Sequence, residues 1–288
     1  MSNLTNNNGL PLITVYITSF NRPEMLSRAI ESVINQSYVN WELIIIDDAS
    51  DNDVASVIIK YSHLDSRIKY WINEKQSGAN FNRNLAIEKA QGKYITGLDD
   101  DDYFKPNRLE FFMGNYNSKY AFICDNRDVL ESDGTISQSY KSKEQEVSLS
   151  DILKSNVCGN QIFAETQRLR KLGGFDLNIR KFQDHDMWIS LISNFGSAYR
   201  FNECSYVVDV RHEQQRISNI EDTNQANVVL YYKYKNLYTP YTDSSIRLKI
   251  ASANLDTDLP FKVTDFIFHP IESLKLATRK TLKKHKAE

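Results

Sequence analysis

Residues 93–106 read KYITGLDDDDYFKP, in which an apolar segment is followed at once by four aspartates. The apolar, β-branched and aromatic residues of 93–98 are typical of a strand buried on both faces of a sheet. Adjacent carboxylates repel one another, and a hard divalent cation such as Mg²⁺ or Mn²⁺ relieves that repulsion. Alternate side chains of an extended segment point to opposite sides, so only part of Asp99–Asp102 can bind one metal ion. The rest can accept hydrogen bonds, and the alternative is a solvated acidic turn.

Strands and helices alternate through the first hundred residues. Apolar runs predict strands at 12–17, 42–46, 68–72 and 93–98, with helices after Asn21-Arg22-Pro23-Glu24, at about 53–61 and at 79–91, where Gly92 is the expected stop. Asn21 and Glu24 have the spacing of a capping box. This alternation predicts an α/β fold with a doubly wound, mostly parallel sheet, in which ligands bind beyond the carboxyl ends of the strands. The polar segments 18–22, 47–48 and 99–102 should therefore meet on one rim.

The second half of the chain is more mixed. A helix should begin at Pro106, and strands are expected at 120–124, 159–164 and 205–210. Gly173-Gly174 marks a tight turn, and residues 187–195 have the apolar face of a helix. Further helices are expected after residue 215. Gln183–Asp186 opens that helical face, so its carboxylates either stabilise the helix N-terminus or line a pocket in which one is a general base. His212 follows a strand and is either structural or exposed, or else a ligand of a metal or phosphate.

The composition excludes several classes of protein. The 288 residues carry a net charge of −2, without the basic excess typical of a nucleic-acid binder. Three distant cysteines, Cys124, Cys158 and Cys204, predict reduced core thiols rather than a disulfide framework or a zinc site. The N-terminus lacks a signal pattern, and no apolar run approaches the roughly 20 residues that span a bilayer. We therefore expect a cytoplasmic protein without a transmembrane helix.

The known glycine-rich nucleotide motifs are missing from the sequence. Neither G-x-G-x-x-G nor a P-loop occurs, which disfavours dinucleotide and P-loop binding. An acidic residue after the second strand of such a sheet commonly binds a nucleoside, and Asp47-Asp48 has this position. The alternative is that Asp48 or Ser50 caps the following helix.

Five segments, in this order, resemble the motifs of the family 2 glycosyltransferases, which are inverting enzymes with the GT-A fold. They are ITSFNR (17–22), WELIIIDDASDN (41–52), RNLAIEKAQGKYITGLDDDDYFKPNRLE (83–110), LGGFDLNIRKFQDHDMWISL (172–191) and RHEQQRIS (211–218). Gln183 stands where the family usually has Glu, and the spacing of the last segment differs slightly. The resemblance implies a GT-A domain over 11–218, with a nucleotide-sugar-binding half (11–105) and an acceptor-binding half (106–218). A helical C-terminal extension would occupy 219–288.

The resemblance also implies a role for each matching residue. In the nucleotide-sugar site, which would include Arg83, the nucleotide would lie at Thr18, Phe20 and Arg22, its base would bind Asp48, and its ribose would bind Asp99 or Asp100. Asp101 would ligate Mn²⁺ or Mg²⁺ with the diphosphate, and His212 would ligate the metal or contact the diphosphate. Asp184 would be the catalytic base. The metal would neutralise the leaving diphosphate. A single displacement would then invert the anomeric centre.

The substrates follow only from the same resemblance. It favours a bacterial enzyme that builds a surface polysaccharide, such as the O-antigen of lipopolysaccharide or a capsule. UDP-glucose or UDP-galactose would be the donor, and the acceptor sugar would be carried on a polyprenyl diphosphate. The alternatives are a nucleotide-sugar-binding assembly scaffold and another nucleotide-sugar enzyme such as a pyrophosphorylase. A pyrophosphorylase expects a glycine-rich loop after the first strand, where this chain has Thr18–Arg22.

The C-terminal segment 261–288 combines apolar and basic side chains at helical spacing. The apolar residues are Phe266, Ile267, Phe268, Ile271, Leu274, Leu276 and Leu282, and the basic ones are Lys275, Arg279, Lys280, Lys283, Lys284 and Lys286. One interpretation is an amphipathic helix on an anionic membrane surface, which would hold the protein at the inner face of the cytoplasmic membrane. The other is a helix packed on the domain with a solvated basic end.

Overall fold

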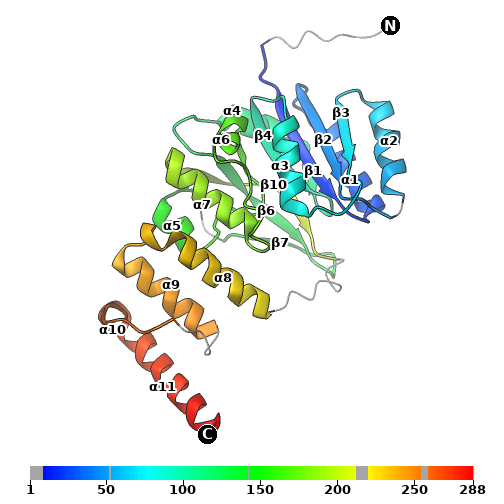
Figure 1. Cartoon of the computed structure of the whole chain (residues 1–288). Coiled ribbons are helices and arrows are strands. Elements are labelled where there is room, and N and C mark those ends of the chain that lie inside the picture. Colours follow the sequence, from blue (N-terminus) through cyan, green and yellow to red (C-terminus); the bar gives the residue numbers. More distant parts are fainter. Residues whose placement is uncertain (1–8, 52, 142, 212–219, 254–258, 288) are drawn as a thin grey trace.

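The computed structural model describes residues 9–51, 53–141, 143–211, 220–253 and 259–287, which form a mixed sheet covered by helices (Figure 1). The strands are β1 (Ile13–Ser19), β2 (Trp41–Asp47), β3 (Ile68–Ile72), β4 (Tyr94–Asp99), β5 (Tyr103–Phe104), β6 (Ile123–Leu130), β7 (Ile136–Gln138), β8 (Gln145–Val147), β9 (Phe163–Glu165) and β10 (Ala198–Asp209). The helices are α1 (Pro23–Ile34), α2 (Val54–Leu64), α3 (Ala79–Lys89), α4 (Arg108–Asn115), α5 (Leu149–Lys154), α6 (Thr166–Lys171), α7 (Gln183–Phe195), α8 (Ile220–Tyr234), the 3-10 turn η2 (Lys235–Leu237), α9 (Pro240–Ala253), α10 (Val263–Phe268) and α11 (Pro270–Ala287).

The sheet has the strand order β3-β2-β1-β4-β9-β6-β10-β5, with β7 paired to β6 and β8 paired to β10. The long pairings, of β1 with β2 and β4, of β2 with β3 and of β6 with β10, are parallel. The short pairings are antiparallel. The predicted α/β class with a mostly parallel sheet is therefore confirmed.

Strand β2 shows why four consecutive residues, Leu43–Ile46, are apolar. Ile44 and Ile46 point into one core, which includes residues of α3, α6 and α7, whereas Leu43 and Ile45 point into the other, with α1, α2 and α4. Every residue of β2 is buried. Because helices cover both faces of the sheet, the strand needs apolar side chains in both directions, and this produces a continuous run instead of an alternating pattern.

The register of the parallel strands brings the predicted polar segments together. Thr18 lies beside Ile46 on one side and beside Asp99 on the other, and Ser19 lies beside Asp47. The carboxyl ends of β1, β2 and β4 therefore lie at one edge of the sheet, as the alternation of strands and helices predicts.

Two predictions about helix ends are wrong. Asn21 does not form a capping box with Glu24: its backbone has φ +56°, and its side chain accepts the backbone N–H of Asp51. The predicted helix 79–91 ends at Lys89, before Gly92. A Cβ atom at Gly92 would lie 2.5 Å from the backbone nitrogen of Thr14, so this glycine allows close packing and does not end the helix.

The beginning of α2 settles one alternative left open by the sequence. Its N-cap residue is Asp53, so neither Asp48 nor Ser50 caps this helix.

In the second half of the chain, β6 and β9 begin three or four residues after the predicted starts, at Ile123 and Phe163. Strand β10 begins earlier than predicted, at Ala198, because it also pairs with β8.

Helices α8 to α11 follow the sheet domain in sequence, and Figure 1 shows α11 leading away from the sheet. Leu276 of α11 is buried against Leu248 and Ala251 of α9, so part of the C-terminal segment packs on the protein. In the described part of the chain, no helix is long and apolar enough to span a membrane. The three cysteines are free and buried, as expected.

Candidate active site

A cleft of about 730 Å³ opens at the carboxyl ends of β1, β2 and β4. The residues predicted from the sequence that line it are Thr18, Phe20, Arg22, Asp48, Arg83, Asp99, Asp100, Asp101 and Asp184. The structure thus brings together every predicted site residue except His212, which lies outside the described residues. The floor comes from the parallel strands, and Asp184 is contributed by the first turn of α7.

Asp100 fixes the loop that follows β1. Its carboxylate accepts the Oγ hydroxyl of Ser19 at 2.9 Å and Nη1 of Arg22 at 2.9 Å. The same Arg22 nitrogen lies 2.8 Å from the carboxylate of Asp101. Burial raises the pKa of Asp100 to about 6, although the Arg22 guanidinium opposes the rise. One arginine therefore faces two buried carboxylates, and negative charge remains at this end of the cleft.

Asp99 is held by side-chain amides from the segment before β9. Asn160 Nδ2 donates to Asp99 Oδ2 at 2.6 Å, and Gln161 Nε2 donates to Oδ1 at 2.9 Å. The Asp99 side chain is 26% exposed, compared with 7% for Asp100. Asp99 is thus the more accessible of the two carboxylates predicted to bind ribose.

Asp102 connects the aspartate run to β10. It accepts the hydroxyl of Tyr206 at 2.7 Å and the backbone N–H of Asp209 at 3.0 Å. Burial and the charges of Asp99 and Asp101 raise the pKa of Asp102. The four aspartates therefore have different surroundings: Asp100 and Asp102 brace the first loop and β10, and Asp99 is the most exposed.

Asp48 organises the loop before α3. Its carboxylate accepts the backbone N–H groups of Ser77 at 2.8 Å and Gly78 at 3.0 Å, and also the side-chain amide of Asn73 at 3.1 Å. Burial raises the pKa of Asp48, but these hydrogen bonds and one from Asn82 outweigh burial and leave the pKa below its ordinary value. Asp48 is therefore an ionised acceptor at the edge of the cleft.

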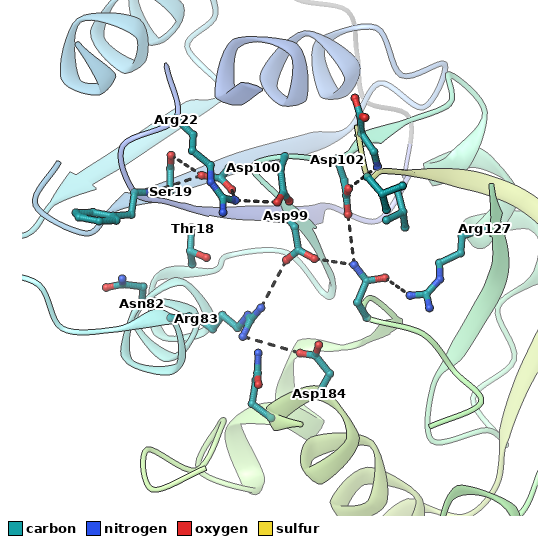
Figure 2. A pocket seen from close by; sticks show the side chains of 18 of the residues that line it. Thr18, Ser19, Arg22, Asn82, Arg83, Asp99, Asp100, Asp102, Arg127 and Asp184 are labelled. Carbon is teal, nitrogen blue, oxygen red and sulfur yellow. Dashed lines mark hydrogen bonds and ion pairs between the residues drawn. The ribbon is translucent and has the colours of Figure 1, made fainter. Parts of the chain in front are cut away.

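Asp184 and Arg83 face each other inside the cleft. Arg83 Nη1 lies 3.9 Å from Asp184 Oδ1, and its Nη2 lies 3.5 Å from Asp99 Oδ1, as Figure 2 shows. Both the Asp184 Oδ1 atom and the Arg83 Nη1 atom are buried without a hydrogen-bond partner among the described residues. Burial raises the pKa of Asp184 to about 6; Arg83 lowers it and Asp99 raises it. Asp184 is a carboxylate with a proton affinity suited to base catalysis near neutral pH.

The rest of the Gln183–Asp186 segment divides between the cleft and the core. Gln183 lines the cleft. His185 contacts the backbone oxygen of Ile152 at 2.6 Å, and burial lowers its pKa. Asp186 accepts the hydroxyl of Tyr234 at 2.7 Å and pairs with Lys233. His185 and Asp186 therefore fasten α7 to its neighbours, and neither lines the cleft.

Four further residues belong to the site, although the sequence analysis does not identify them: Asn82, Arg127, Asn160 and Gln161. Arg127 donates to Asn160 Oδ1 at 2.7 Å and to Ser139 Oγ at 2.9 Å. Asn160 in turn holds Asp99. Asn82 adjoins Arg83 in the sequence, and this adjacency is the one sequence feature that points to Asn82 as a site residue. The other three come from irregular or strand segments without a recognisable pattern.

The donor atoms at Asp101 fit a hard divalent cation. No set of three His, Cys, Asp or Glu side chains among the described residues is arranged to hold a metal ion by itself. Mg²⁺ and similar ions, however, are commonly bound by one or two carboxylates and complete their coordination with substrate phosphates and water. Asp101 lies in the cleft beside carboxylates whose pKa values are raised, so added positive charge would be stabilised there.

Solved structures of glycosyltransferases share this fold. The crystal structure of S. aureus TarS 1–349 has a TM-score of 0.67 at 15% identity, covering 93% of this chain and 78% of that one. The mannosyltransferase PcManGT from Pyrobaculum calidifontis, in complex with GDP-Man and Mn²⁺, has a TM-score of 0.58 at 14% identity, covering 95% and 84%. The sheet and the site rim at its carboxyl edge define a GT-A type fold.

Sequence comparison defines the family. The glycosyl transferase family 2 model matches residues 14–171. The putative colanic acid biosynthesis glycosyl transferase WcaA of Escherichia coli K12 is 32% identical over 79% of this chain and 83% of its own length. The UDP-Glc:alpha-D-GlcNAc-diphosphoundecaprenol beta-1,3-glucosyltransferase WfgD of Escherichia coli is 28% identical over 64% and 70%. The chain belongs to glycosyl transferase family 2, which confirms the resemblance seen in its motifs.

Proposed function

We propose that this protein is an inverting, metal-dependent hexosyltransferase that moves a sugar from a UDP-sugar to a hydroxyl of an acceptor sugar. The observation that carries the proposal is the placement of Asp184. Its buried carboxylate, with a raised pKa, lies in the same cleft as the aspartates at the ends of β2 and β4. A base at that position can take the proton of an incoming hydroxyl.

The proposed reaction is a single displacement. The acceptor oxygen forms a bond to the anomeric carbon, its proton passes to Asp184, and the bond to the diphosphate breaks on the opposite face to release UDP. Asp99 binds the ribose, because it is the more accessible of the two candidate carboxylates. Asp48 lies at the base, and Arg83 holds Asp99 and Asp184 in one geometry. A divalent metal held by Asp101 would neutralise the diphosphate charge when bound.

The donor and the acceptor are inferred from relatives. A UDP-sugar is supported by the name of WfgD and by a structure of TarS 1–349 with UDP-GlcNAc, which has a TM-score of 0.58 at 17% identity and covers 90% of this chain and 70% of that one. UDP-glucose and UDP-galactose are our first candidates. The diphosphoundecaprenol in the name of WfgD supports a lipid-linked acceptor, and WcaA supports a role in bacterial polysaccharide synthesis. Such an acceptor would place the protein at the inner face of the cytoplasmic membrane.

The direct test is a donor screen with Mn²⁺ and a synthetic lipid-diphosphate sugar acceptor, in which UDP release is measured. Transfer from an α-linked donor should yield a β-linked product, which NMR of the anomeric proton identifies. An α-linked product would contradict the single displacement. A protein that binds UDP-sugars but transfers none to any acceptor would favour the scaffold alternative.

The transfer rate should depend on pH through Asp184. The base must be ionised, and burial raises its pKa to about 6. The rate at limiting substrate is therefore expected to rise about tenfold per pH unit below pH 6 and to level off above it. Initial UDP release from pH 4.5 to 8 measures this, with UDP affinity determined at each pH as the control. A rate that stays constant down to pH 5 would mean that no group with this pKa acts as the base.

Removing the Asp48 carboxylate should weaken nucleotide binding. Asp48→Ala leaves the N–H groups of Ser77 and Gly78 without their acceptor and removes the proposed contact to the base. Calorimetry should show UDP affinity falling by about 1–3 kcal/mol, which is roughly fivefold to 150-fold. Asp53→Ala, at the exposed start of α2, is the matched control and should bind UDP normally. Equal affinities for the two variants would remove Asp48 from the nucleotide site.

A further inference from the structure

Helices α10 and α11 expose large apolar side chains that no described part of the protein covers. Val263 and Ile267 of α10 are 76% and 65% exposed, and Ile271, Leu274 and Leu282 of α11 are 64%, 65% and 58% exposed. Figure 1 shows both helices at the far end of the chain from the sheet. Exposed apolar residues that occur singly are ordinary on protein surfaces, but a row of them on adjacent elements marks a contact site.

The apolar row on α11 lies opposite the face that packs on the protein. At about 100° per residue, Ile271, Leu274 and Leu282 share one side of the helix, and Ser273 and Leu276 point about half a turn away from them. Ser273 and Leu276 are buried, with Leu276 against α9. The fold therefore uses one side of α11 and leaves its apolar opposite side without a partner among the described residues.

Beyond its first turn, α11 carries charges of one sign. Residues 273–287 contain six Lys and Arg and no Asp or Glu. Between α9 and α11 lies a pocket of about 420 Å³ with an apolar wall of Leu248 and Leu276. Lys249, Lys275, Arg279 and His269 line it, together with one acid, Glu272. In the helix geometry Lys275 and Arg279 lie between the packed side and the apolar row, so basic groups border the exposed apolar residues along one side.

We infer that the exposed row of α10 and α11 docks on the surface of an anionic phospholipid bilayer, with a lipid phosphate in the basic pocket between α9 and α11. Apolar side chains that enter the acyl boundary, flanked by Lys and Arg that pair with anionic headgroups, are the requirements of an interfacial helix. A second copy of the chain is a poorer partner. A symmetric contact would place the basic Lys275 and Arg279 on both sides of the interface.

Binding to vesicles tests this docking without any nucleotide or sugar, so its outcome is independent of the proposed reaction. The whole chain is sedimented with two kinds of vesicle. One contains phosphatidylcholine alone, and in the other about 30 mol% of the lipid is phosphatidylglycerol, which makes the surface strongly negative. The wild type should partition at least about tenfold more strongly onto the anionic vesicles, and added salt should weaken the binding. Equal partition onto both vesicles, or none, would overturn the inference.

Paired variants identify the surface. The double variant Ile271→Glu/Leu274→Glu, and separately Lys275→Gln/Arg279→Gln, should each lower partition at least about tenfold. Ile136→Glu/Leu177→Glu, at similarly exposed positions outside the C-terminal helices, and Lys60→Gln/Lys89→Gln are the matched controls and should bind as the wild type does. Unchanged thermal unfolding and UDP affinity would show that each variant is folded. Wild-type vesicle binding by Ile271→Glu/Leu274→Glu would overturn the inference. The inference would also be overturned if the wild type bound no vesicles and formed an oligomer that this double variant dissociates.

Discussion

Replacing Asp184 with Asn is expected to lower the transfer rate about 10²–10⁴-fold, the usual contribution of a positioned general base. The amide has nearly the shape of the carboxylate but cannot take the proton of the acceptor hydroxyl. UDP affinity should stay within about twofold of wild type, because the binding residues are on other elements. Turnover is measured as UDP release at saturating donor, and binding by calorimetry. Unchanged turnover would refute the proposed base.

The same substitution should make the protein more stable. Asp184 has a raised pKa because burial disfavours its charge, so its contribution to stability is greatest below pH 4 and is lost as pH rises through about 6. At pH 7.5 the Asp184 carboxyl of the wild type is charged, and burying that charge lowers stability by its full amount. Asp184→Asn removes the buried charge, so the free energy of unfolding should rise by on the order of 1–3 kcal/mol. Urea unfolding of both proteins at pH 7.5 and pH 4.5 measures this, and the difference should shrink at the lower pH.

Asp186→Asn is the matched control, because Asp186 lies two residues away in the same helical turn but outside the cleft. Its carboxylate binds Tyr234 and Lys233, so the variant should unfold more easily yet transfer sugar at a rate within a few-fold of wild type. Asp184→Asn should thus lower the transfer rate and raise stability, whereas Asp186→Asn should lower stability and leave the transfer rate nearly unchanged. A scaffold that only binds nucleotide sugars would show the stability effects without any difference in turnover.

The position of the site could be predicted from the sequence because it depends on backbone topology. Continuous apolar runs identify β1, β2 and β4, and parallel strands necessarily bring their carboxyl ends to one edge. Asp48 and Asp99 follow directly from this rule. Asp184 comes from the first turn of α7 and needed the family resemblance, since acidic residues at a helix N-terminus are also common as caps.

The differences among the four aspartates could not be predicted, because they depend on contacts distant in sequence. Asp102 is held by Tyr206, and Asp99 by Asn160 and Gln161, all from the second half of the chain. The alternation of an extended strand would give Asp100 and Asp102 one common side. Instead, Asp100 faces the loop of Arg22 and Asp102 faces β10. The chain turns directly after Asp99, where β4 ends, so the alternation no longer applies.

Asp101→Asn is expected to have the second large effect, a loss of metal-dependent UDP binding and about 10²–10³-fold slower transfer. A metal that stabilises the charge of a leaving diphosphate contributes several kcal/mol, and each 1.4 kcal/mol corresponds to about a factor of ten in rate. The neutral amide is a much weaker ligand for a hard cation. Titrations of UDP with and without Mn²⁺ should therefore differ for the wild type and coincide for the variant.

The control for this prediction keeps the charge of the cleft intact. Asp51→Asn removes an exposed acid outside the cleft and should retain both the effect of Mn²⁺ on UDP affinity and the transfer rate. Arg22 also matters to the outcome, since it donates 2.8 Å to Asp101 and 2.9 Å to Asp100. In the variant Arg22 keeps Asp100 as its partner, so the loop after β1 should stay folded and the loss should be confined to the metal. Identical UDP affinity of the wild type with and without Mn²⁺ would instead show that Asp101 holds Arg22 and no cation.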